Sequence, residues 1–190
     1  MNHKTLPSNY RYFTTLDFTR NRRQIMAVLK LAIALTVVPL VIGAAVTVMR
    51  PEVLGFVKDW RLWVAMFAML VAYIPLHELT HSAAMLALSG VKPTFGLKLP
   101  YAYAGSTAWF DRTSHVITAV APLVVWGVTL QILIFTLSPR WFWPLWIVQI
   151  SNLSGSAGDI YCAWVLMKMD GDVLIQDTGT RMRVMRYVEK

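Results

Sequence analysis

The chain has 190 residues, enough for one compact domain, and 56% of them are hydrophobic whereas 15% are charged. A soluble domain has about a quarter charged residues, so most of this chain must face lipid or a lipid-embedded core. The net charge of +8 is concentrated at the ends of apolar runs, which is typical of membrane topology and argues against nucleic-acid binding. The lone Cys162 excludes an intrachain disulfide and a cysteine zinc cluster.

Four segments are apolar enough to span a bilayer, which takes about 20 residues each. They cover approximately residues 25–49, 60–88, 116–137 and 141–167. The first segment follows a polar and basic stretch and is too long for the apolar core of a cleavable signal peptide, so we expect a retained helix. The pattern predicts an all-α integral membrane fold with four transmembrane helices.

Basic residues indicate how these helices cross the membrane. Four spans place an N-terminal tail (residues 1–23) and a C-terminal tail (residues 169–190) on the same side of a membrane domain of residues 24–168. The tails and the loop of residues 90–113 contain most of the lysines and arginines. The positive-inside rule therefore predicts a multi-pass protein of the cell membrane, surrounded by the lipid bilayer, with both termini cytoplasmic.

The loop of residues 90–113, between the second and third predicted helices, has two interpretations. Pro93, Gly96, Pro100 and Gly105 disfavour a helix there. Large side chains alternate with small or polar ones over residues 94–104, which is typical of a short strand or β-hairpin. An ordinary surface loop on the cytoplasmic side is the alternative.

Ionisable side chains are costly inside a membrane, so those within predicted spans are candidates for function. The second span contains the run His77-Glu78-Leu79-Thr80-His81. Histidines four residues apart lie on one face of a helix and can share a metal ion, while Glu78 lies beside that face. This is the His-Glu-x-x-His pattern of zinc metallopeptidases. The alternative is a polar cluster that only packs helices together.

A catalytic zinc usually has three protein ligands, and Asp159 in the fourth span is the candidate for the third. The second and fourth spans are expected to run in the same direction. His77 lies 17 residues after Trp60, and Asp159 lies 18 residues after Trp141. With a rise of about 1.5 Å per residue, both side chains are expected at nearly the same depth. The sequence therefore predicts a Zn²⁺ site of His77, His81 and Asp159.

Two further polar residues belong to the same spans. Asn152 lies seven residues before Asp159, so it is expected on the same side of the helix. It either contacts a substrate carbonyl or oxyanion, or it makes a hydrogen bond between helices. His115, at the start of the third span, is expected in a supporting or surface position and not as a ligand.

The stretch from Ala72 to Met167 resembles a known group. A His-Glu-x-x-His span followed by Asn-Leu-Ser-Gly at residues 152–155 and Gly-Asp at residues 158–159 is similar to small bacterial membrane proteins named putative zincin peptidases, formerly a domain of unknown function. That group is similar in plan to site-2 proteases, a class of intramembrane metallopeptidases. Those proteases usually have a proline-containing Asn motif and Leu-Asp-Gly, whereas residues 155–160 of this chain read Gly-Ser-Ala-Gly-Asp-Ile.

The resemblance implies that His77, His81 and Asp159 bind zinc and that Glu78 is the catalytic glutamate. It also implies that the loop of residues 90–113 engages extended substrates. The expected function is a membrane-embedded zinc peptidase that hydrolyses membrane-associated or transmembrane substrates, with Glu78 as general base on a zinc-bound water. Two alternatives would use the same residues: an inactive zinc-binding membrane scaffold, and a metal transporter, which would be expected to have an internal repeat.

Overall fold

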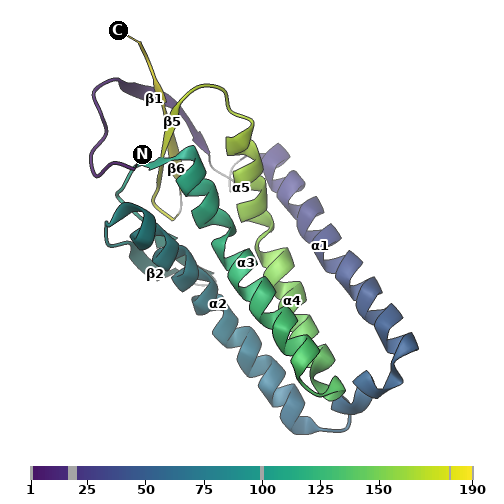
Figure 1. Cartoon of the computed structure of the whole chain (residues 1–190). Helices are drawn as coiled ribbons and strands as arrows, with labels where there is room; N and C mark the ends of the chain where they lie inside the picture. The colour runs from purple at the N-terminus through teal and green to yellow at the C-terminus, as the bar shows by residue number, and fades with distance from the viewer. Residues whose placement is uncertain (1, 17–20, 99–100, 180, 190) are drawn as a thin grey trace. The chain divides into compact units, whose positions relative to one another are not determined.

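The computed structural model describes residues 2–16, 21–98, 101–179 and 181–189. Its helices and strands follow one another in the order shown in Figure 1. They are β1 (Tyr10–Leu16), α1 (Arg22–Met49), α2 (Trp60–Ser89), β2 (Thr94–Lys98), β3 (Tyr101–Gly105), β4 (Phe110–Asp111), α3 (Arg112–Thr136), α4 (Phe142–Gly155), α5 (Ala157–Met167), β5 (Val173–Asp177) and β6 (Met182–Tyr187). Short 3₁₀ turns at Pro51–Phe56 and Pro139–Trp141 connect α1 to α2 and α3 to α4.

Three helices are long and apolar enough to cross a membrane within the described ranges: α1, α2 and α3. They correspond to the first three predicted spans and indicate a membrane protein. The predicted fourth span is not one helix, because α4 ends at Gly155 and α5 begins at Ala157. Gly155 and Gly158, on either side of Ser156, have low helix propensity, and this explains a break that hydropathy alone does not reveal.

The prediction of an all-α fold is wrong in one respect, because strands from both predicted tails form a sheet. The strand order is β1-β6-β5-β4, and every neighbouring pair is antiparallel. Figure 1 shows β1, β5 and β6 beside one another near the two chain ends. β1 has the sequence Tyr-Arg-Tyr-Phe-Thr-Thr-Leu, in which aromatic and β-branched residues favour a strand. A separate antiparallel pair, β2 and β3, joins α2 to β4.

The chain divides into two compact units. The first consists of residues 1–26, 78–121 and 158–190, and the second of residues 27–77 and 122–157. The boundaries fall within α1, α2, α3 and α5, so each of these helices contributes residues to both units.

The core of the first unit lies between α5 and the inner face of the four-stranded sheet. Its fully or nearly fully buried members are Leu16, Cys162, Leu166, Val173, Ile175 and Val184. A smaller cluster of Met85, Ala108 and Phe110 packs the end of α2 against the chain around β4. Asn2 fixes the same region, because its side-chain Nδ2 donates to the Leu88 carbonyl at 2.8 Å and its Oδ1 accepts from the Asp111 amide at 3.0 Å.

In the second unit, apolar side chains of α2, α3 and α4 pack around Tyr73, Leu130, Leu145 and Val148. α1 is held to α4 by two tryptophan side chains. The Trp143 indole donates to the Thr47 hydroxyl at 3.0 Å, and the Trp146 indole donates to the Pro39 carbonyl at 3.0 Å. These contacts keep α4, which contains Asn152, in a fixed position within this unit.

Candidate metal centre

Helix α2 contains the His-Glu-x-x-His motif in one unbroken helical stretch. His77 and His81 are one turn apart, so the helix itself places both rings on the same face. Both side chains are nearly buried, with 9% and 8% of their surfaces exposed, and Glu78 between them is half-buried. The two histidines of the motif are therefore nearly buried and do not lie on the freely exposed face of the helix.

His81 has defined partners in the first unit. Its Nδ1 lies 2.9 Å from the Thr118 carbonyl of α3, and its Nε2 lies 3.6 Å from Oδ1 of Asp159. A carbonyl only accepts, so Nδ1 is the nitrogen that bears hydrogen in this contact. This arrangement directs Nε2 towards the Asp159 carboxylate.

The Thr118 carbonyl is available because of Pro122. In a helix this carbonyl would accept a hydrogen bond from the N–H four residues later, and proline has no N–H. The proline thus supplies an acceptor inside an apolar helix, and His81 uses it.

Asp159 is in the first turn of α5, directly after the break between α4 and α5. Peptide N–H groups at the start of a helix favour a carboxylate there. The break therefore does more than interrupt an apolar run, because it places an acidic side chain at a helix N-terminus within reach of His81.

His77 has its partners in the second unit. Its Nδ1 lies 2.7 Å from the Tyr73 hydroxyl, and that hydroxyl donates to Oδ1 of Asn152 at 2.8 Å. The Nδ2 of Asn152 donates to the Leu123 carbonyl at 3.2 Å. Asn152 is completely buried, so both ends of its amide are used within the protein. Of the two interpretations from sequence, these contacts correspond to hydrogen bonding between helices.

The donor set suits zinc. Two imidazole nitrogens and one carboxylate oxygen are a ligand set found in catalytic zinc sites, which keep one position open for water. His77, His81 and Asp159 are a group that could hold a metal ion, and each histidine has its other ring nitrogen engaged by an oxygen atom, as is usual for zinc-ligating histidines. The residues present therefore fit the ion that the sequence predicts.

Tyr73 and Thr118 were not identified as site residues from the sequence. Tyr73 lies four residues before His77, and this helical spacing indicates that the two side chains are neighbours on α2. Thr118 contributes a backbone carbonyl, and only the position of Pro122 in the sequence could have indicated it.

His115 is also buried in the first unit, with 1% of its surface exposed. Neither ring nitrogen has a hydrogen-bond partner among the described residues, and Nε2 lies 3.9 Å from Oδ2 of Asp177 at the end of β5. Burial raises the pKa of the Asp177 carboxyl to about 6, against the effect of the Gly179 amide that donates to it.

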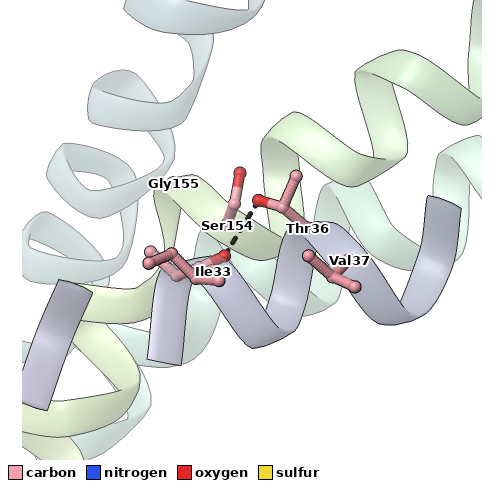
Figure 2. A pocket seen from close by; sticks show the side chains of 6 residues that line it. Ile33, Thr36, Val37, Ser154 and Gly155 are labelled. Atoms are coloured by element: carbon pink, nitrogen blue, oxygen red, sulfur yellow. Dashed lines mark hydrogen bonds between the residues drawn. The ribbon is translucent and has the colours of Figure 1, made fainter. Parts of the chain in front are cut away.

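A groove of about 450 Å³ lies between α1 and α4 in the second unit (Figure 2). Its lining consists of Ala32, Ile33, Thr36, Val37, Ser154 and Gly155. The Thr36 hydroxyl donates to the Ala32 carbonyl at 2.8 Å within α1, as Figure 2 shows. None of the candidate ligands is among the residues that line this groove.

Comparison with known proteins supports the same chemistry. A protein of Pyrococcus woesei, named "Uncharacterized 24.7 kDa protein in gap 5'region", is 29% identical to this chain over 145 residues. The match covers 76% of this chain and 64% of that protein, so the chain spans less than two thirds of its relative. No solved structure matches the chain. The family described as "Putative zincin peptidase" matches residues 70–174, which include all the candidate ligands and Glu78, and the chain belongs to this family.

Proposed function

We propose that this protein is a zinc-dependent, membrane-embedded peptidase that cleaves membrane-associated or transmembrane protein substrates. The observation that supports this most directly is the 3.6 Å approach of His81 Nε2 to Asp159 Oδ1, with His77 one helical turn away on α2. Such a set of ligands would hold a zinc ion beside a glutamate. Membership of the zincin peptidase family supports the same reaction.

Four residues have a role in this proposal. His77, His81 and Asp159 hold the metal ion. When bound, zinc supplies Lewis acidity, which lowers the pKa of water and polarises a carbonyl oxygen. Glu78 accepts the proton of the attacking water and returns it to the leaving amine. Half-buried Glu78 is adjacent to His77 in sequence, which keeps its carboxylate close to the ligands without making it one.

The test is Glu78→Gln, which removes the base and keeps the size of the side chain. The purified variant should bind zinc with wild-type stoichiometry, while kcat for cleavage of a labelled transmembrane reporter should fall by about 10²–10⁴-fold. Glu52→Gln is the matched control, because Glu52 is an exposed glutamate outside the motif and its replacement should leave kcat unchanged.

Each outcome of this experiment has a clear meaning. Wild-type turnover by Glu78→Gln would refute the assigned base. Zinc binding without cleavage by the wild-type protein, across a panel of transmembrane reporters, would favour the inactive scaffold. Net zinc uptake into vesicles would favour a transporter.

We also propose that the chain lies in the cell membrane with both termini in the cytoplasm. Cys162 is 1% exposed, so a cysteine introduced at Tyr12, which is 65% exposed in β1, would be the accessible thiol. In intact cells Tyr12→Cys should resist a membrane-impermeant maleimide and should react after lysis. Labelling before lysis would contradict this orientation.

A further inference from the structure

The contacts of His77 form a chain that starts at a backbone carbonyl. The Leu123 carbonyl of α3 only accepts hydrogen bonds, so the Asn152 atom 3.2 Å from it is the amide nitrogen. The opposite end of the amide, Oδ1, then faces the Tyr73 hydroxyl at 2.8 Å. One carbonyl group thus decides which way the Asn152 side chain is oriented.

The orientation of the Asn152 amide determines which atom receives the hydroxyl hydrogen of Tyr73. A phenol has one hydrogen, and Oδ1 of Asn152 is an acceptor only, so Tyr73 donates this hydrogen to Asn152. The 2.7 Å contact between the Tyr73 oxygen and His77 Nδ1 then needs its hydrogen from the imidazole. His77 therefore carries its hydrogen on Nδ1, and Nε2 carries the lone pair that can ligate a metal.

We propose that Tyr73 and Asn152 are positioning residues that fix the Nδ1–H tautomer of His77 and thereby prepare Nε2 for metal binding. His81 reaches the same tautomer in one step, because its Nδ1 faces the Thr118 carbonyl directly. Burial strengthens the preference of His77 for this tautomer. Asn152 is 0% and Tyr73 8% exposed, so water has little access to compete for their hydrogen bonds. This inference rests on the proposed function only in taking His77 as a ligand.

Two substitutions break the chain at different links. Asn152→Ala removes the acceptor of the Tyr73 hydroxyl, which is then able to donate to His77 Nδ1 and favours the Nε2–H tautomer, the wrong one for binding. Tyr73→Phe keeps the ring and removes the hydroxyl, so His77 loses the partner of Nδ1. Loss of such supporting bonds weakens metal binding by about 10–100-fold.

Gln149 provides the matched control. It lies on α4 one turn before Asn152, is 7% exposed, and its Nε2 donates to the Gly127 carbonyl of α3 at 3.4 Å. Its Oε1 accepts no hydrogen bond among the described residues. Gln149→Ala therefore removes a similar buried amide without interrupting the path from Leu123 to His77, and should leave both the tautomer and zinc affinity unchanged.

The experiment uses the full chain in detergent with two readouts. The first is the ¹⁵N chemical shifts of the His77 ring in the metal-free protein, which distinguish the two tautomers; the second is the zinc dissociation constant from chelator competition. We expect the Nδ1–H form in the wild type, the Nε2–H form in Asn152→Ala, and about 10–100-fold weaker zinc binding in both single variants. Once Tyr73 is Phe, adding Asn152→Ala should weaken zinc binding no further, because the chain is already broken.

Several results would overturn the proposal. An Nε2–H tautomer in the wild type would do so, as would unchanged tautomer and affinity in Asn152→Ala, or additive losses in the double variant. If Asn152→Ala does not fold, Tyr73→Phe, which deletes one oxygen atom, decides the matter through zinc affinity. The tautomer is read without metal or substrate, so a protein that cleaves nothing would refute the proposed function and leave this measurement intact.

Discussion

Asp177 leads to a prediction about how stability depends on pH. Its side chain is buried on the inner side of the sheet, where Oδ1 accepts from the Gly179 amide at 2.7 Å and Oδ2 lies 3.9 Å from His115 Nε2. His81 and Asp159 act on it by charge from farther away. Burial is the largest of these influences; it outweighs the lowering by Gly179 and His81 and raises the pKa of the carboxyl to about 6, compared with about 3.9 for an unfolded aspartate.

The raised pKa of Asp177 determines whether the unfolding free energy rises or falls with pH. The folded state holds the proton of Asp177 more tightly than the unfolded state, so its contribution to stability is complete below about pH 4 and is lost as pH rises through about 6. A difference of about two pKa units corresponds to about 3 kcal/mol of unfolding free energy between these limits. For a chain of this size, that is about 6–12 °C in melting temperature.

Asp177→Asn removes the ionisation and keeps the acceptor for Gly179. Melting temperatures of both proteins, measured with a chelator present at pH values from 4 to 7, should show the wild type losing about 6–12 °C relative to the variant as pH rises. The chelator excludes metal binding as a source of pH dependence. A difference between the two melting curves that stays constant across this range would refute the assignment of a raised pKa to Asp177.

Two other predictions concern the packing and the candidate centre. At Gly105 a Cβ atom would lie 2.5 Å from the backbone carbon of Thr178, so Gly105→Ala should lower the unfolding free energy by about 1–3 kcal/mol. At Gly155 an added Cβ meets nothing within 4 Å, so Gly155→Ala should not lower it. Thermal melting of the two variants distinguishes these effects, and equal effects would contradict the close approach at Gly105. Pro122→Ala should restore an N–H that competes with His81 for the Thr118 carbonyl. The stability of α3 should therefore rise while zinc binding weakens. Tighter zinc binding by the variant would contradict this role for the proline.

Local patterns in the sequence were sufficient for the helices and for the motif. The apolar runs that predict α1, α2 and α3 are long enough that no tertiary contact is needed to recognise them. His77 and His81 share a face because of helical periodicity alone. Asp159 required a long-range argument from depth, and its 3.6 Å approach to His81 agrees with that argument although α4 and α5 are separate helices.

The four-stranded sheet could not be predicted in the same way. The pairing of the edge strand β1 with β6 joins residues at opposite ends of the chain, such as Tyr10 with Tyr187. A register shift between Tyr12 and Thr14 also interrupts the alternation of side chains in β1. Each strand alone is too short to stand out from a charged tail, and only pairing with the others buries residues such as Val184.

The candidate centre depends on α3 in a way that the His-Glu-x-x-His motif does not reveal. The motif places two imidazoles on one face of α2, but it leaves open which nitrogen of each ring carries hydrogen. Carbonyl groups of α3 decide this, Thr118 directly for His81 and Leu123 through two side chains for His77. A helix normally uses its own carbonyls, and Pro122 explains why the first of them is available. The orientation and tautomer of the ligands in this protein therefore depend on how α2 is packed in each unit. A chain that has the motif without these acceptors would have the same ligands, but its histidine tautomers would not be fixed for zinc binding.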